Sequence, residues 1–148
     1  MNTHAGGCHC GALRYRVAGE LSCRTLCHCT ICRATTGAPA VAWFTVPLAD
    51  FAWLQGAPRR YDSTPGATRS FCGGCGAQLT FWRHGLDEID VTIASLDDAA
   101  ALAPEDQTFT RSELPWMQRL AALPRHAAAR PEPGGSGHPG DGGGGKTV

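Results

Sequence analysis

The stretch Cys72-Gly73-Gly74-Cys75-Gly76 brings two cysteines together within one short turn. Glycine permits the left-handed backbone values that such a turn requires, and it lets backbone N–H groups approach the sulfur atoms. Two thiolates from one turn can reach the same ion, and zinc binds sulfur ligands in a tetrahedral arrangement. The stretch is therefore typical of a zinc knuckle, which needs two further ligands from elsewhere in the chain.

Five of the other six cysteines are also clustered. Two lie in Cys8-His9-Cys10, and three lie in the segment 27–32, which reads C-H-C-T-I-C and which we expect to be one loop. The spacing leaves open whether the knuckle is completed by Cys8 and Cys10 or by members of the middle cluster. Four of the seven thiolates would close one zinc site, and three would leave a second site with a free position. Closed sites are usually structural, whereas open sites are usually catalytic.

Cys23 stands outside these clusters, four residues before Cys27. It could supply a fourth ligand and close the second site, but we expect it to be a small buried apolar side chain in a strand. His9 and His28 each lie between two clustered cysteines. We expect both imidazoles to point away from the metal.

The bulk composition excludes several classes of function. The chain has 148 residues, which predicts one domain, and its 13 basic side chains balance 13 acidic ones. Without a basic run, no nucleic-acid partner is expected. The apolar stretch 37–54 is interrupted by prolines and an aspartate, so no membrane span or membrane partner is expected. The segment 1–7 is not a secretory signal, and the free cysteines suit a reducing cytoplasm. The oligomeric state stays open.

Apolar and polar residues alternate in several short segments separated by glycine and proline. This pattern predicts a mostly β, single zinc-stabilised domain of short antiparallel strands. The expected strands are Leu13–Val17, Leu21 onward into the Cys27 cluster, Val41–Val46, Gln78–Trp82 and Glu88–Ala94. Phe51–Leu54 is a short apolar run before a turn, and Asp97–Leu102 could form a helical turn. We expect the domain to span residues 4–123 and the Pro/Gly-rich segment 124–148 to be a disordered tail, because it contains few large apolar side chains.

Three motifs occur in a recognisable order: G-G-C-H-C-G-A-L-R-Y from Gly6, C-H-C-T-I-C-R from Cys27, and F-C-G-G-C-G-A-Q-L from Phe71. Together they resemble the glutathione-dependent formaldehyde-activating enzyme (GFA) family, whose relatives include centromere protein V. The resemblance runs from about Gly6 to Trp116. It implies a mostly β, zinc-binding fold similar to that of a Rab guanine-nucleotide exchange factor.

The resemblance also implies two zinc ions per chain. The structural zinc would be held by the first C-x-C and the later C-x-x-C, which are Cys8, Cys10, Cys72 and Cys75. The second, catalytic zinc would be held by Cys27, Cys29 and Cys32. The implied enzyme is a carbon–sulfur lyase that reversibly adds glutathione to formaldehyde, giving S-hydroxymethylglutathione, or that catalyses a related thiol–aldehyde reaction. The main alternative is a non-catalytic zinc-binding protein-interaction module.

Glutathione carries two carboxylates, so the site needs cationic side chains. Arg33 directly follows Cys32 and is the first candidate for binding this substrate. Arg69 and Arg24 are the next candidates, although we expect both to be solvated surface arginines. 

Aromatic side chains could wall the substrate pocket. Trp116 is one candidate, whereas we expect Trp43 and Phe44 to belong to the core. A thiol redox protein acting through Cys72 and Cys75 is a further alternative, which the surrounding cysteine clusters disfavour.

Overall fold

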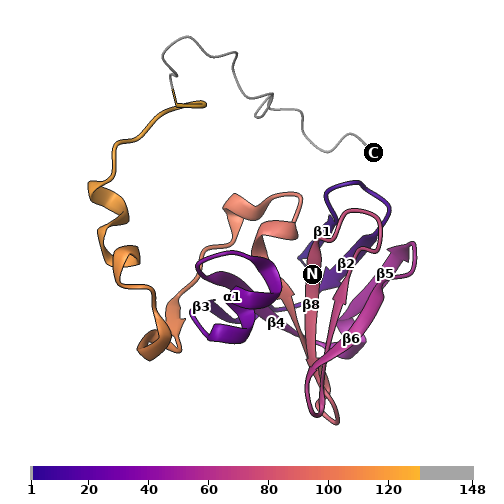
Figure 1. Cartoon of the computed structure of the whole chain (residues 1–148). Helices are drawn as coiled ribbons and strands as arrows, with labels where there is room; N and C mark the ends of the chain where they lie inside the picture. The colour runs from indigo at the N-terminus through magenta and orange to yellow at the C-terminus, as the bar shows by residue number, and fades with distance from the viewer. Residues whose placement is uncertain (1, 131–148) are drawn as a thin grey trace. The chain divides into compact units, whose positions relative to one another are not determined.

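The structure, a computed structural model, describes residues 2–130. These form two compact units, one ending at Leu114 and the other beginning at Pro115. The first unit contains two sheets (Figure 1). The smaller sheet has the strand order β1-β2-β5 and is antiparallel throughout. Its strands are β1 (Thr3–Gly7), β2 (Arg14–Ala18) and β5 (Phe51–Gln55).

The larger sheet has seven strands in the order β10-β3-β4-β9-β8-β7-β6. Their bounds are β3 (Ser22–Cys27), β4 (Val41–Pro47), β6 (Arg59–Thr64), β7 (Ala67–Phe71), β8 (Gln78–Arg83), β9 (Glu88–Thr92) and β10 (Asp106–Thr108). All neighbouring pairs are antiparallel except β10 and β3, which run parallel. The predicted mostly β fold is therefore confirmed, with one parallel pair that the sequence did not indicate.

The main core is built from both sheets. Tyr15 and Val17 of β2 pack in the same buried cluster as Phe44 of β4, Leu79 of β8 and Val91 of β9, and none of these five side chains is exposed. Full burial of one large apolar side chain contributes about 1.5–3 kcal/mol. The inward faces predicted for β2 and β9 from their alternating patterns are confirmed.

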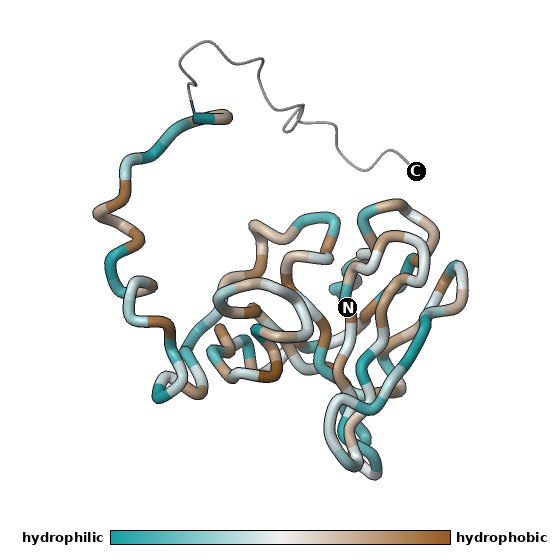
Figure 2. The backbone as a smooth tube through the Cα atoms, in the orientation of Figure 1, coloured by the Kyte–Doolittle hydropathy of each residue, from teal (hydrophilic) through white to brown (hydrophobic). Residues whose placement is uncertain are grey.

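The hairpin of β6 and β7 was missing from the expected strands. Pro65-Gly66 joins the two strands, and Gly66 adopts a positive φ of 77°. β6 is the edge strand, and its first four residues are exposed. Figure 2 shows much of it as hydrophilic. Because no face of β6 is consistently buried, its sequence does not alternate, and the Pro-Gly dipeptide was the available signal.

The segment expected to be a loop around the middle cysteines contains the helix α1 (Thr30–Thr36). Cys29 caps its N-terminus, where its sulfur accepts a hydrogen bond from the backbone N–H of Cys32 at 3.2 Å. Gly37 ends the helix with a left-handed φ of 71° and donates its N–H to the Arg33 carbonyl at 2.8 Å. Cys32 therefore lies on a helix, and the loop prediction is wrong.

The other helical segments are short 3-10 turns: η1 (Leu48–Asp50), η2 (Ile93–Ser95), η3 (Ala99–Ala101), η4 (Thr110–Ser112) and η5 (Pro115–Ala122). η3 falls within the predicted helical turn at 97–102. η2 begins where the predicted strand 88–94 was expected to continue, so β9 ends earlier, at Thr92.

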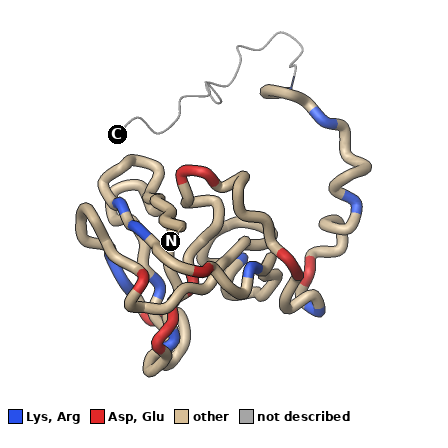
Figure 3. Tube along the Cα trace, turned by 180° about the vertical axis from the view of Figure 1, so that it is seen from behind, with Lys and Arg blue, Asp and Glu red and all other residues tan. Residues whose placement is uncertain are grey.

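Residues 124–130 form neither helix nor strand. The rest of the predicted disordered tail, 131–148, lies outside the described residues, and the boundary after residue 123 stays a prediction. No helix in the described part of the chain is long and apolar enough to cross a membrane. Basic and acidic residues are interspersed along the Cα trace (Figure 3), and their numbers are equal in the full sequence.

Candidate functional site

The first cysteine group brings together the cysteines of the first and third sequence motifs. The sulfur atoms of Cys8, Cys10, Cys72 and Cys75 all lie within 4.8 Å of one another. Cys10 Sγ is 3.6 Å from Cys8 Sγ and 3.7 Å from Cys72 Sγ. Four sulfurs bound to one zinc at its usual bond length would lie about 3.8 Å apart. This group could therefore hold a tetrahedrally coordinated metal ion. Spacing alone had left open which cysteines complete the knuckle, and in the structure they are Cys8 and Cys10.

Backbone N–H groups stabilise thiolates in this group. The N–H of Leu13 donates to Cys8 Sγ at 3.2 Å. The backbone N–H of Ala77 contributes most to lowering the pKa of the Cys75 thiol, to about 6. Gly76 precedes Ala77 with a φ of 77°, a conformation that directs this backbone toward the sulfurs. Metal ligation requires deprotonated sulfur, so these contacts prepare the group for a cation.

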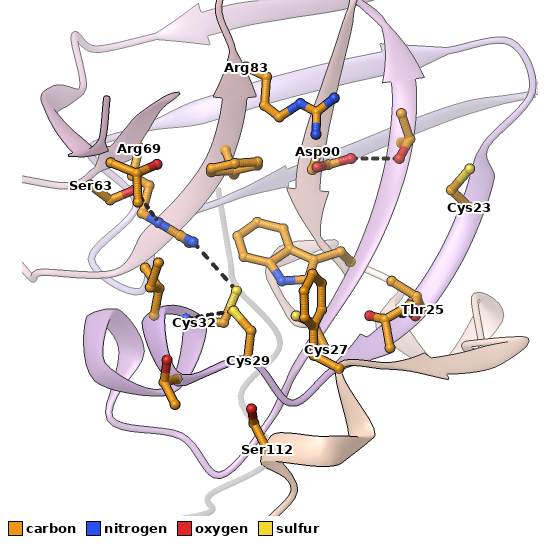
Figure 4. A pocket seen from close by; sticks show the side chains of 18 of the residues that line it. Cys23, Thr25, Cys27, Cys29, Cys32, Ser63, Arg69, Arg83, Asp90 and Ser112 are labelled. Carbon is orange, nitrogen blue, oxygen red and sulfur yellow. Dashed lines mark hydrogen bonds between the residues drawn. The ribbon is translucent and has the colours of Figure 1, made fainter. Parts of the chain in front are cut away.

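The second group consists of the sulfurs of Cys27, Cys29 and Cys32, again within 4.8 Å of one another (Figure 4). Cys27 ends β3, Cys29 caps α1, and Cys32 lies in the first turn of α1. Cys27 and Cys32 are buried, whereas Cys29 is half-buried. The sequence prediction thus named three cysteines that do converge, and three sulfur donors could hold a metal while leaving room for another ligand.

Cys23 differs from what was expected. It is exposed rather than buried, has a φ of 47°, and its sulfur is not part of the three-sulfur group. It lies where the pairing of β3 with β4 is irregular, between Ser22 and Thr25. This irregular backbone turns its side chain out of the core, so the sulfur does not close the second group.

The thiols of the second group are electrically coupled. A hydrogen bond with Cys32 lowers the pKa of the Cys27 thiol to about 7. The same contact, together with burial, raises the pKa of Cys32.

The three-sulfur group lies in the wall of a cavity of about 610 Å³, which belongs to the first unit. Ligand pockets usually have volumes of about 300–1,000 Å³. The cavity is lined by aromatic and apolar side chains (Trp43, Phe81, Phe109, Ile31, Leu86) and by charged ones (Arg69, Arg83, Arg111, Glu88, Asp90), together with Cys23, the three cysteines, and several threonines and serines. Figure 4 shows Cys23 across the cavity from Cys29 and Cys32.

Arg69 is the residue that sequence reasoning misjudged most. Expected to be solvated, it is only 3% exposed and lies in the cavity wall. Its Nη2 donates to Cys32 Sγ at 3.4 Å (Figure 4), and its Nε donates to Ser63 Oγ at 2.9 Å. Arg69 lies on β7, a strand that was not predicted from the sequence. Recognising this strand would have placed Arg69 within the sheet.

The other candidate substrate residues are distributed as follows. Arg33 does not line the cavity. Arg24 forms an ion pair with Glu105. Trp43 lines the cavity although it was expected in the core, whereas Phe44 does lie in the core.

Trp116 belongs to the second unit and is 44% exposed.

His28 contributes to the frame around the second group. It is fully buried, and its Nε2 is hydrogen-bonded to Gln107 Oε1 at 2.8 Å. Its backbone N–H donates to the Thr108 carbonyl at 3.0 Å. Neither its ring nor that of the exposed His9 belongs to a sulfur group, in agreement with the expectation for both residues. The pairing with β10 thus fixes the segment that carries Cys27 and Cys29.

Comparison with known proteins agrees with this geometry. The family model described as "Glutathione-dependent formaldehyde-activating enzyme" matches residues 3–112. The chain is also similar to a crystal structure of a Rhodobacter sphaeroides protein, with 30% sequence identity and a TM-score of 0.56. That match covers 70% of this chain and 99% of the other. On these grounds the chain belongs to the glutathione-dependent formaldehyde-activating enzyme family.

Proposed function

We propose that this protein is a zinc-dependent carbon–sulfur lyase that reversibly adds glutathione to formaldehyde, giving S-hydroxymethylglutathione, or that catalyses a closely related thiol–aldehyde reaction. The observation that carries the proposal is the convergence of Cys27, Cys29 and Cys32 in the wall of a ligand-sized cavity. Three sulfur donors with space beside them follow the pattern of catalytic rather than structural zinc sites. We place the activity in the cytoplasm, where thiols are kept reduced.

Two zinc ions per chain fit the donor sets. Cys8, Cys10, Cys72 and Cys75 would hold a structural zinc, and the group of Cys27, Cys29 and Cys32 would hold the catalytic one. A zinc bound to this second group would keep a coordinated thiol deprotonated at neutral pH, whereas a free thiol with a pKa of about 8.5 is mostly protonated.

The reaction itself needs few groups. The sulfur of glutathione forms a bond to the carbonyl carbon, the π electron pair moves to the oxygen, and that oxygen takes up the proton that the thiol released. Formaldehyde adds thiols without a catalyst, so the cavity contributes by holding both reactants together. Trp43 is almost fully buried, and Phe81 is half-buried beside it in the cavity wall. Both rings exclude water from the sulfur side of the cavity.

The charged lining matches the charges of glutathione, which has two carboxylates and one ammonium group. Arg83 and Arg111 are exposed cations in the cavity lining, and we assign the carboxylates to them. Glu88, also exposed in the lining, is assigned the ammonium group. Arg33, the candidate predicted from sequence for carboxylate binding, lies outside the lining, so these arginines replace it.

The test is the exchange of carbon-13 label between free formaldehyde and S-hydroxymethylglutathione, followed by NMR with zinc-loaded full-length protein. The wild-type protein should accelerate this exchange, and Cys29→Ser should not. Cys23→Ser is the matched control, because it removes a cavity cysteine whose sulfur lies outside the group. A folded, zinc-loaded wild type that leaves the exchange rate unchanged would refute the proposal and favour the non-catalytic interaction module.

A further inference from the structure

Arg69 is a buried cation that forms no salt bridge within residues 2–130, although the carboxyl of Asp90 lies close enough to interact with its charge. Its side chain is 3% exposed, and the ion pairs found within residues 2–130 join other side chains. Arginine stays protonated in proteins, so it cannot lose its charge to avoid burial. A buried charge is costly unless an opposite charge lies nearby. No hydrogen bond joins Asp90 to Arg69 within residues 2–130, so compensation also has to come from the groups in direct contact with the guanidinium.

The surroundings of Arg69 point to the sulfur atoms. Nη2 donates to Cys32 Sγ at 3.4 Å, Nε donates to a neutral serine hydroxyl, and Nη1 is buried with no hydrogen-bond partner among the described residues. Two aromatic rings flank the guanidinium, with Cζ 4.8 Å from the centroid of Phe81 and 5.7 Å from that of Trp43. Phe81 stands directly opposite Arg69 on β8, which fixes this stacking. Cys32 thus connects Arg69 to a group that would become anionic when its three sulfurs ligate a metal ion.

We propose that Arg69 is the counter-ion of the Cys27, Cys29 and Cys32 group and that it makes this group favour an anionic fourth ligand, a thiolate, over a neutral one. The thiolate in question is the substrate sulfur of the proposed function, so the inference rests on that function. Three thiolates and one divalent zinc have a net charge of −1, and a thiolate ligand changes this to −2. Arg69 offsets one of these charges, and the rings beside it keep water from screening the attraction. A neutral ligand adds no charge and receives no such benefit. Arg69 is therefore a positioning residue, which acts through Cys32.

The test is a ligand titration of the cobalt-loaded full-length protein, read from the sulfur-to-cobalt and d–d absorption bands. The probes are glutathione, the small anion azide and the neutral ligand imidazole. The variants are Arg69→Met, which removes the charge, Arg69→Lys, which keeps it, and Arg69→Gln, which keeps an N–H donor without charge. Arg60→Met is the matched control, because Arg60 is exposed on β6 and does not line the cavity.

An opposite charge within a few ångströms shifts such equilibria by about one to three powers of ten, so Arg69→Met and Arg69→Gln should each weaken azide and glutathione binding about tenfold or more. Imidazole binding should stay close to that of the wild type. Arg69→Lys should keep most of the affinity for anions, and Arg60→Met should behave as the wild type. Circular dichroism checks that each variant is folded. If Arg69→Met does not fold, Arg69→Gln is compared with the wild type instead.

The outcomes separate the two proposals. Equal losses for azide and imidazole would show that Arg69 merely maintains the shape of the site, which overturns the inference, as would unchanged affinity for every probe. The expected azide pattern without any response to glutathione would support the role of Arg69 and contradict the proposed function. A wild type that responds to none of the probes would have no free ligand position, which overturns both.

Discussion

Replacing Cys75 by serine should destabilise the fold much more than replacing Cys29 by serine. Cys75 belongs to the four-sulfur group, in which Cys10 and Cys72 are 62 positions apart. A metal ion there closes a long loop and so removes conformational freedom from the unfolded chain. Cys29 belongs to a group confined to residues 27–32, which closes only a very short loop.

The difference can be worked from loop-closure entropy. The chain-entropy relation for a cross-link gives a stabilisation of the folded state of about 4 kcal/mol for a loop of 62 residues. For a loop of five residues it gives a stabilisation of about 2 kcal/mol. Serine is also a good N-cap, so Cys29→Ser keeps the hydrogen bond that begins α1. We therefore expect Cys75→Ser to be less stable than Cys29→Ser by about 2 kcal/mol. For a unit of this size the gap corresponds to roughly 8 °C in the midpoint of thermal unfolding.

The assay is thermal unfolding followed by far-ultraviolet circular dichroism, combined with metal analysis of protein purified in the presence of zinc. The wild type should carry two zinc ions, and each variant should carry one. A small domain has about 5–15 kcal/mol of stability, so the loss of about 4 kcal/mol in Cys75→Ser removes a large share of it. If both variants retain two zinc ions and melt with the wild type, or if Cys29→Ser is the less stable of the two, the division into structural and catalytic groups is wrong.

Three further substitutions test single side chains. Burial raises the pKa of Asp90, so stability falls as pH rises from the ordinary aspartate range through that raised pKa. Asp90→Asn keeps an acceptor for the Thr45 hydroxyl and should be more stable than the wild type in urea at pH 7, with a gap that shrinks below about pH 4. Tyr15→Phe removes the hydroxyl that is hydrogen-bonded to Ser95 Oγ at 2.6 Å and should cost about 1 kcal/mol in urea unfolding, with an unchanged dichroism spectrum. Phe109 has a left-handed φ of 55° and is 54% exposed, so Phe109→Asn should gain about 1 kcal/mol, and unchanged or lower stability would contradict this reading of the strain.

The elements that the sequence predicted well are those with a periodic buried face. Tyr15 and Val17 alternate with exposed or half-buried neighbours in β2, and Ile89 lies between exposed Glu88 and half-buried Asp90 in β9, because each strand covers the core with one face. The close sulfur pairs also predicted metal ligation, but spacing left the partner of Cys72 and Cys75 open, and only the family resemblance implied Cys8 and Cys10. β1 escaped prediction because Gly6 and Gly7 carry no side chain that could show a pattern.

The parts that the sequence could not predict depend on contacts between distant segments. β10 is three residues long and pairs in parallel with β3, an arrangement that leaves no local pattern. Arg69 resembles any surface arginine until β7 places it opposite Phe81 and beside Cys32. Cys23 does lie in a strand, as expected, but the irregular pairing of β3 with β4 leaves its side chain exposed rather than buried.

The different spans of the two sulfur groups set an order of events during synthesis. All three sulfurs of the second group leave the ribosome within six residues, so this group can capture an ion while most of the chain is still unmade. Its counter-ion follows 37 positions after Cys32, and the last sulfur of the first group, Cys75, follows soon afterwards. A nascent chain can therefore be metallated before its preference for a charged ligand exists, and that preference arises only once β7 has joined the sheet.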